Sequence, residues 1–393
     1  MIDLSTEAAR RRSGVLRADV TDDDALRSLD ARMLWSALIE PGDGVAGALI
    51  AAYGPRAALE IAVGARELPS VRSDDIREGR RRWMARVDEA TTAVARARAA
   101  GVMPLTPEDE SWPRRLDDLG VHAPVCLWWR GSAEVLRLPR SVALVGARAS
   151  TAYGEHVTAE LAAGLAGRGA VVVSGAAYGI DAVGHRNALL AEGPTVAWLA
   201  GGVDRPYPAG NRHLIERIVG EGGAVVAEVP CGASPTKWRF LARNRLIAAS
   251  SVATVVVEAG WRSGSLNTAG HAAQLGRPLG AVPGPVTSAA SAGCHRLLRE
   301  YGAQCVTGVD DVLELMGSLD DSRASDAREV AAVSSTDPAD RLIAALNATA
   351  PRGVAELSQR TGLRADEVSA ALGLLALEGR VAEGPKGWRR ASR

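Results

Sequence analysis

The 393-residue chain contains few cysteines, few histidines and no net charge. Its four cysteines, Cys126, Cys231, Cys294 and Cys305, form no CxxC pair, and its six histidines show no ligand spacing. This pattern argues against a structural zinc site and against a disulfide framework. Because the formal net charge is zero, a site for a polyanion has to come from local clusters of positive residues.

Lysine is almost absent. Of the 46 basic residues only Lys237 and Lys386 are lysines, and the others are arginines. Arginine makes bidentate contacts to phosphate and stacks on bases, which favours a nucleic-acid ligand. A coding bias that also enriches alanine explains the same composition equally well, so composition alone does not decide.

The sequence also lacks long apolar runs. The N-terminal stretch MIDLSTEAARRRSG has no apolar signal-peptide core, and no eighteen consecutive apolar residues occur anywhere. We therefore expect a cytoplasmic protein with no membrane partner. A chain of this length is too long for one compact core, so two or three domains are expected.

Residues 1–103 are predicted to form a helical domain. An apolar stripe that begins at Leu26 ends at the turn 41–44, and a second helical run, 45–53, stops at Gly54-Pro55. Short helices around a glycine-bearing turn resemble sterile-alpha-motif or helix-hairpin-helix modules. Such modules bind DNA or proteins, and the sequence leaves that choice open.

Residues 104–316 change to short apolar runs that alternate with helical patterns. This texture predicts βαβ units: an α/β, Rossmann-like domain with a mostly parallel sheet and helices on both faces. The runs are continuously apolar, as expected of strands that are covered on both sides. The predicted strands are 141–145, 170–173, 195–199, 224–229, 253–257, 279–282 and 304–306.

The C-terminal part is predicted to be a linker, 317–338, followed by a winged helix-turn-helix domain, 339–393. The linker is rich in Ser, Asp and Ala, and three helical patterns and a hairpin follow it. The expected recognition helix, 364–378, carries Asp366 and Glu367 and is poorly equipped for a major groove. We therefore expect weak duplex binding from this domain.

In open parallel sheets, ligands bind beyond the carboxyl ends of the strands. After the first predicted strand, Gly146 permits a sharp turn, Ser150 or Thr151 can cap the next helix, and Arg148 lies where a phosphate would meet the amide ends. The loop is neither GxGxxG nor a Walker loop, which disfavours a nicotinamide or ATP site. We expect no cofactor and no metal.

The next two loops offer further polar groups. Ser174 and Gly175 are typical of an anion nest, although a glycine that is needed only for tight packing gives the same sequence pattern. Tyr207 can offer a stacking face to a base. Asn211 is expected mainly to tie its loop down by local hydrogen bonds, and His185 mainly to pack.

The stretch around residue 244 is the richest in candidates. Arg243 and Arg245 project about 200° apart on a helix, so one of them can face a phosphate while the other anchors on a carboxylate such as Glu228 or Glu258. Downstream, Ser263-Gly264-Ser265 precedes a helix that carries Thr268, which predicts an oxyanion cradle. Four loops at strand ends thus supply glycine, hydroxyl or arginine groups, as a nucleic-acid backbone would require.

These motifs together resemble the DNA-processing protein A (DprA) family, also called Smf, over residues 104–310. The matching stretches, in order and spacing, are Gly146-Ala147-Arg148, Ser174-Gly175-Ala176 with Gly179-Ile180-Asp181, Tyr207-Pro208 with Asn211, Arg243-Asn244-Arg245, Ser263-Gly264-Ser265-Leu266 and Val282-Pro283-Gly284. Leu241 stands where the family commonly has proline, and Cys294 stands where it commonly has asparagine.

The resemblance implies a dimeric, non-enzymatic protein that binds single-stranded DNA during natural transformation, protects it and loads the recombinase RecA. The predicted DNA-binding residues are Gly146, Arg148, Ser150, Ser174, Gly175, Tyr207, Asn211, Arg243, Asn244, Arg245, Ser263, Gly264, Ser265 and Thr268.

Two alternatives stay open at this point. One is an enzyme of the nucleotide phosphoribohydrolase type, with Glu258 as the carboxylate, although that group's Pro-Gly-Gly-x-Gly-Thr signature is missing and no acid and base pair stands out. The other is a regulator in which the winged helix binds DNA and the Rossmann-like domain senses a small ligand.

Overall fold

A computed structural model describes residues 2–64, 66, 73–317, 338–346, 351–361, 363–377, 380–384 and 387–390. It divides into two compact units, Met1–Met316 and Gly317–Arg393. The predicted linker, 317–338, lies outside the described residues except at its two ends.

The first unit begins with five helices among the described residues, and acidic side chains cap the starts of the second and the third. Asp22 accepts a hydrogen bond from the Ala25 amide (2.8 Å), and Asp43 accepts from the Val45 and Ala46 amides (3.0 and 3.1 Å). The helices are α1 (Thr6–Arg12), α2 (Asp23–Leu38), α3 (Gly44–Val63), α4 (Ser73–Met84) and α5 (Val87–Ala99).

Helix α3 bends where the sequence predicts a stop. Gly54 adopts a left-handed φ of 77°, and the helix resumes at Pro55, so the predicted end at Gly54-Pro55 is a kink. In the described part of the chain, α3 is the one helix long and apolar enough to cross a membrane by length and composition. Core helices of soluble proteins share those properties, and Leu49, Leu59 and Ile61 of α3 are buried.

The centre of this unit is a nine-stranded sheet in the order β1-β2-β6-β5-β4-β3-β7-β8-β9 among the described residues. The strands are β1 (Met103–Leu105), β2 (Leu127–Gly131), β3 (Ser141–Gly146), β4 (Val171–Ser174), β5 (Thr195–Leu199), β6 (Ala224–Ala227), β7 (Ala253–Glu258), β8 (Leu279–Ala281) and β9 (Gln304–Cys305). The strands from β3 to β9 run parallel, and β2 pairs antiparallel with β6 and β1. All seven predicted strands are present, and the short antiparallel pair β1 and β2 was not predicted.

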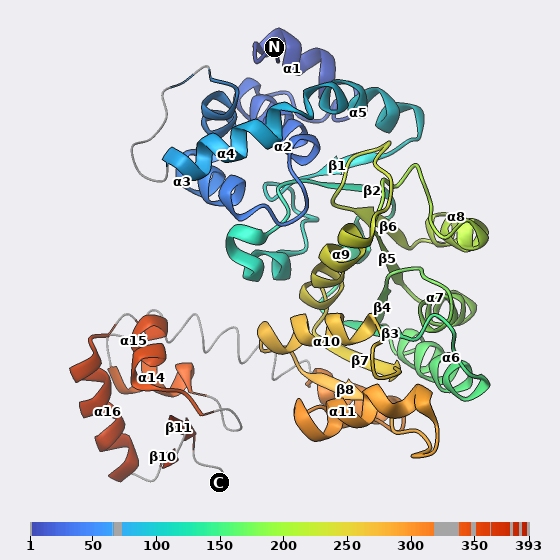
Figure 1. Cartoon of the computed structure of the whole chain (residues 1–393), viewed down its shortest axis with the longest axis vertical. Helices are drawn as coiled ribbons and strands as arrows, with labels where there is room; N and C mark the ends of the chain where they lie inside the picture. Colours follow the sequence, from blue (N-terminus) through green and yellow to red (C-terminus); the bar gives the residue numbers. More distant parts are fainter. Residues whose placement is uncertain are drawn as a thin grey trace. The chain divides into compact units, whose positions relative to one another are not determined.

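Helices cover both faces of the sheet (Figure 1). One face carries α6 (Ala152–Ala166), α7 (Ile180–Leu190), α8 (Arg212–Gly220) and α12 (Val309–Met316), and the other carries α9 (Lys237–Ala249), α10 (Ser265–Gln274) and α11 (Ala292–Glu300). Short 3-10 turns lie at η1 (Arg114–His122), η2 (Glu134–Arg137), η3 (Ala209–Asn211) and η4 (Ala289–Ser291). The predicted Rossmann-like architecture is confirmed.

The strand order places a topological switch between β3 and β7. From β3 the chain adds β4, β5 and β6 on one side, and it then returns to place β7, β8 and β9 on the other. Loops that leave two such neighbouring strands in opposite directions open a crevice beyond the carboxyl ends of the sheet. The loops after β3 and β7 therefore define where a ligand would bind.

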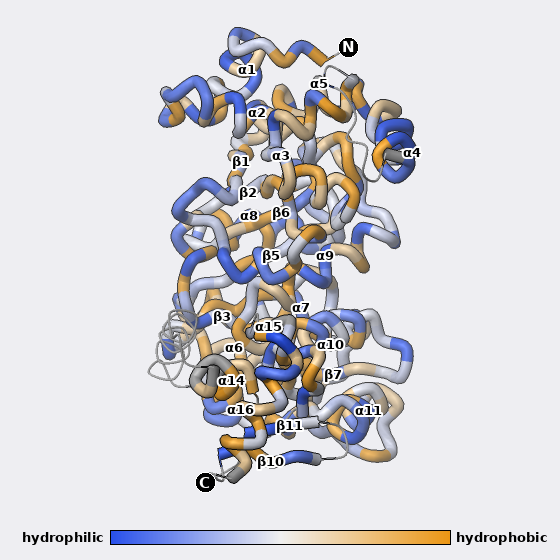
Figure 2. Tube along the Cα trace, turned by 90° about the vertical axis from the view of Figure 1, so that its left-hand side faces the viewer, coloured by the Kyte–Doolittle hydropathy of each residue, from blue (hydrophilic) through white to orange (hydrophobic). Residues whose placement is uncertain are grey.

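The helical N-terminal segment shares its core with the sheet. One apolar cluster joins Trp35 and Trp83 to Trp128 of β2 and Val225 of β6. The Trp35 and Trp83 rings meet edge to face at 5.0 Å, and the Trp128 Nε1 donates to Ser36 Oγ at 3.1 Å. Figure 2 shows apolar segments running through the interior of the N-terminal helices and the central strands, with hydrophilic segments outside.

The second unit has its own core. Its elements are α14 (Pro338–Ala345), α15 (Val354–Thr361), α16 (Ala365–Leu377), β10 (Val381–Gly384) and β11 (Gly387–Arg390). Leu342, Leu357 and Leu372 are fully buried, and β10 pairs antiparallel with β11. Three helices followed by a hairpin confirm the predicted winged-helix fold.

Candidate nucleic-acid interface

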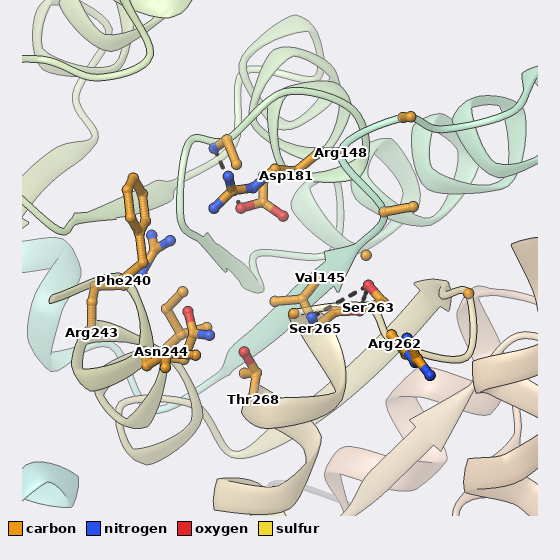
Figure 3. Close-up of a pocket in the computed structure, with 18 of the residues that line it drawn as sticks. Val145, Arg148, Asp181, Phe240, Arg243, Asn244, Arg262, Ser263, Ser265 and Thr268 are labelled. Carbon is orange, nitrogen blue, oxygen red and sulfur yellow. Dashed lines mark hydrogen bonds between the residues drawn. The ribbon is translucent and has the colours of Figure 1, made fainter. Parts of the chain in front are cut away.

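A cavity of about 530 Å³ opens at the switch point between β3 and β7. The loops after these two strands form its sides, and residues of α9 form a third side (Figure 3). The predicted DNA-binding residues that line it are Gly146, Arg148, Arg243, Asn244, Ser263, Gly264, Ser265 and Thr268.

The loop after β3 is held by Glu258 at the end of β7. The Glu258 carboxylate accepts hydrogen bonds from the Thr151 amide (2.8 Å) and the Thr151 hydroxyl (2.6 Å). Thr151 is the N-cap of α6, so it fills the capping role that the sequence left open between Ser150 and Thr151. Gly146 has no room for a side chain, since a Cβ would lie 2.5 Å from Ile180 Cγ1. The tight turn leaves Arg148 exposed at the cavity.

The loop after β7 presents two hydroxyls and a helix start. The Ser263 and Ser265 hydroxyls lie 2.8 Å apart, and the Ser265 amide donates to Ser263 Oγ at 3.4 Å. Gly264 is the N-cap of α10, and a side chain there would meet nothing within 4 Å. The positive end of the α10 dipole and these hydroxyls together make a site suited to an anion.

Helix α9 contributes Phe240, Arg243 and Asn244, whose spacing places them on one side of the helix (Figure 3). Arg243 is buried, and its NH1 donates to the carbonyl of Trp198 at 2.5 Å. Burial lowers the pKa of Arg243 to about 10, and the charge of Arg148 acts in the same direction while that of Asp181 opposes it. The guanidinium stays positive at neutral pH and adds to the positive charge of the cavity.

The loop after β4 is closed rather than open. The Gly175 amide donates to Asp181 Oδ2 (3.1 Å), and the buried Ser174 hydroxyl donates to the Leu144 carbonyl (2.7 Å). Burial raises the pKa of Asp181, against the charge of Arg243 and hydrogen bonds from its neighbours. The donors of Ser174 and Gly175 thus have partners within the chain, and direct phosphate binding by these two residues stays a prediction.

The remaining predicted residues also lie outside the cavity lining. Asn211 donates to the Ala176 and Ala177 carbonyls (2.9 and 3.1 Å), which is the local tie expected of it. Ser150 donates to Glu155 (2.7 Å). In the structure both side chains make local hydrogen bonds that shape the loops, and their contact with DNA stays a prediction.

Arg245 faces away from Arg243 and pairs with Glu228. The Arg245 NH2 lies 2.5 Å from Glu228 Oε1, and both side chains are buried. This is the arrangement expected from their angular separation on the helix, with one arginine at the cavity and the other anchored on a carboxylate. Arg245 is the anchored arginine in this structure, and its contact with DNA stays a prediction.

The first turn of α9 is tied to the N-terminal helices. The guanidinium of Arg239 forms two hydrogen bonds to Glu40, at 3.0 and 2.8 Å, and Arg86 lies 2.9 Å from the same carboxylate. Glu40 lies in the turn between α2 and α3. The helix that carries Phe240 and Arg243 is thus positioned by a segment far away in sequence.

Phe240 is a cavity residue that the sequence prediction missed. The Arg148 guanidinium carbon lies 4.9 Å from the centre of its ring, and Tyr207 packs edge to face against it at 5.7 Å. Tyr207 itself is half exposed and does not line the cavity. Phe240 is the one phenylalanine of the chain and precedes Arg243 by one helical turn, and this spacing is the signal by which the sequence could have identified it.

His185 has a structural role in the buried core. His185 is fully buried; its Nδ1 lies 2.7 Å from the hydroxyl of Thr195, and that hydroxyl donates to Val172 O. The histidine therefore donates through Nδ1, and burial followed by the charge of Arg243 lowers its pKa to about 3. Over the described ranges, no group of three or more His, Cys, Asp or Glu is placed to hold a metal ion.

Comparison with known proteins agrees with this geometry. Residues 103–317, more than half of the chain, match the family described as DNA recombination-mediator protein A, and residues 326–387 match the DprA winged helix domain. The DNA processing protein DprA of Mycobacterium tuberculosis (strain H37Rv) is 48% identical over 290 residues, which cover 70% of this chain and 73% of that protein.

The solved structure of a relative supports the same relationship. The X-ray structure of DNA processing protein A from Streptococcus pneumoniae is 31% identical, covers 72% of this chain and 95% of that one, and has a TM-score of 0.59. The Helicobacter pylori DNA processing protein A, whose structure is described for its single-stranded DNA binding mode, is 31% identical, covers 54% of this chain and 93% of that one, and has a TM-score of 0.48. The chain belongs to the DNA-processing protein A (DprA/Smf) family.

Proposed function

We propose that this protein binds the backbone of single-stranded DNA in the cavity between β3 and β7, protects incoming DNA during natural transformation, and loads RecA onto it. The observation that carries the proposal is the meeting of Arg148, Arg243 and the Ser263-Gly264-Ser265 helix start in one cavity. Two cations and a helix N-terminus suit consecutive phosphates, and Phe240 offers a face to a base. Nothing in these groups reads base sequence, so binding is expected to be independent of sequence.

The direct test measures the affinity of the full chain for a labelled oligo-dT by fluorescence anisotropy at several salt concentrations. Arg148→Ala is expected to weaken binding and to reduce the slope of log K against log salt by about one unit or less, because one phosphate contact is lost. Arg168 is an exposed arginine that follows the C-terminal end of α6, remote from the cavity loop at the start of that helix, and Arg168→Ala is the matched control. Equal affinities of wild type and Arg148→Ala would contradict the proposed site.

Competition with duplex DNA shows whether the Rossmann-like domain or the winged helix is the main DNA-binding domain. Helix α16 carries Asp366 and Glu367 in its first turn, which opposes close approach to a phosphate backbone. We therefore expect single-stranded DNA to displace the labelled strand at lower concentration than duplex DNA. A chain that ends at Met316 is expected to keep the single-strand affinity, and loss of that affinity would favour the regulator alternative.

The proposal includes no covalent step. Both oxygens of Glu258 accept hydrogen bonds from Thr151, so this carboxylate is engaged in holding the loop. Incubation with nucleoside monophosphates is expected to release no free base. RecA loading and a homodimer in the cytoplasm are part of the proposal through family membership; RecA filament formation on strands coated with single-strand-binding protein, and sedimentation of the purified chain, test them.

A further inference from the structure

Trp261 leaves most of its surface in water at the edge of the DNA cavity. It lies in the loop between β7 and α10, lines the cavity, and is 57% exposed. Aromatic residues make up 4% of the chain, and the five largest fully buried side chains are all tryptophans. Exposing an indole to water costs hydrophobic free energy. The position of Trp261 beside a phosphate-binding cavity therefore favours a ligand with an apolar face.

The exposed ring is held by a cation. The guanidinium carbon of Arg296, on α11, lies 5.1 Å from the centre of the Trp261 ring. Arg296 is itself fixed, because its Nε donates to Glu300 (2.8 Å) and its NH2 donates to the Tyr301 hydroxyl (3.2 Å). A cation–π contact at this distance restrains the indole without covering all of it.

The backbone just before Trp261 is equally constrained. The Gly293 amide at the start of α11 donates to the Ala259 carbonyl at 2.7 Å. A Cβ at Gly293 would lie 2.7 Å from the carbonyl oxygens of both Ala259 and Gly260, so only glycine permits this approach. The loop that carries Trp261 is therefore built onto α11, and its ring is presented in advance of binding.

The place of Trp261 complements that of Phe240. Phe240 lies on the α9 side of the cavity and Trp261 on the β7 side, with Arg148 and the Ser263–Ser265 turn also lining the space. A strand whose phosphates occupy that space presents its bases to both sides. Flat, exposed aromatic rings bind bases of any identity, because every base has a π face.

We propose that Trp261, positioned by Arg296, is a stacking platform for a nucleobase adjacent to the phosphates held in the cavity. This inference rests on the proposed single-stranded DNA function and adds a base contact to it. The ligand class is an unpaired nucleobase of any sequence, since the platform offers a ring face and no pattern of donors.

The test compares Trp261→Ala with wild type on two probes of equal length, an oligo-dT and an oligonucleotide of abasic sites. The full chain is used, and circular dichroism checks its folding. Loss of the platform is expected to weaken oligo-dT binding roughly five-fold or more. The abasic probe has no base to stack, so its affinity is expected to stay unchanged, as is the salt slope, because no charge is removed. Trp261→Phe, which keeps a ring, is expected to restore most of the affinity.

Trp238 offers a matched control. It is 61% exposed on α9 and does not line the cavity, so Trp238→Ala removes a similar exposed area without touching the platform. Oligo-dT affinity is expected to stay at the wild-type level in this variant. An equal loss in both tryptophan variants would overturn the assignment of Trp261.

The outcomes separate the two proposals. Wild-type oligo-dT affinity in Trp261→Ala, or an equal loss on the abasic probe, overturns the stacking platform while leaving the cavity proposal standing as long as Arg148→Ala weakens binding. If wild type does not bind oligo-dT, or Arg148→Ala binds as wild type does, the proposed function itself fails.

Discussion

Replacing Gly175 by alanine places a methyl group against the guanidinium of Arg243. The added Cβ would lie 1.9 Å from NH1, 2.4 Å from Cζ and 2.5 Å from NH2 of Arg243. Gly175 has no left-handed φ, so its backbone accepts alanine, and the clash is the whole perturbation. The arginine has to move, and it then loses the hydrogen bond from NH1 to Trp198 O.

The magnitude follows from that hydrogen bond. Hydrogen bonds of charged groups contribute about 1.5–3 kcal/mol, so Gly175→Ala is expected to lower the free energy of unfolding by roughly 2 kcal/mol. At about 2–4 °C per kcal/mol for large domains, the melting temperature should fall by roughly 4–8 °C. DNA affinity should fall toward that of Arg243→Ala, because the displaced guanidinium no longer occupies its place in the cavity.

Thermal unfolding and oligo-dT anisotropy measure both effects, and Gly184 supplies the control. A Cβ at Gly184, in the middle of α7, would meet its nearest neighbour at 3.8 Å. Gly184→Ala should therefore be neutral or stabilising by up to about 1 kcal/mol, since alanine favours the helix. The reasoning requires that Gly175→Ala costs little once Arg243 is already alanine. Additive losses in the Gly175→Ala/Arg243→Ala double variant would refute it.

Two further predictions concern pH. His185 has a folded pKa of about 3 and an ordinary value of 6.5, so the unfolded chain binds the extra proton between these values and stability is lost as the pH falls from about 6.5 toward 3. Urea unfolding of His185→Gln should lack this component, which reaches about 1.4 kcal/mol per pH unit in wild type, and equal slopes would contradict the assignment. Burial alone would raise the pKa of Glu40, but hydrogen bonds and charge from Arg239 and Arg86 lower it. The ionised Glu40 carboxylate therefore stabilises the fold above about pH 4.5, and this stabilisation is lost as the pH falls through its folded pKa. Glu40→Gln should accordingly lower the melting temperature more at pH 7 than at pH 3, and a loss that is the same at both values would show that the charge is irrelevant.

The parallel sheet was predictable because its strands are buried on both sides. Runs such as 195–199 and 253–257 are apolar apart from one threonine each, and the structure buries every residue of both. The edge pair was not predictable in the same way. Strand β1 has three residues and includes Pro104, and β2 becomes a strand through its pairing with β6, a contact between distant segments.

The candidate site was predictable where the function lies in a local turn. At Gly146 and in the Ser263–Ser265 turn, a few consecutive residues determine the backbone geometry, and both segments line the cavity. Ser174 and Gly175 have the same composition as an open anion nest, but Asp181, six residues later, and Arg243, on a distant helix, occupy it. A local pattern does not contain a tertiary partner such as Arg243, and for the same reason the sequence prediction missed Phe240.

The apolar cluster that joins Trp35 to Val225 has a consequence for how this protein can be shortened. The N-terminal helices and the sheet share this cluster, so a chain that starts at Met103 would lack the helices that cover Trp128. Such a fragment should aggregate. Proteases added to the native protein should cut elsewhere first, and the helices and the sheet should melt in one cooperative step.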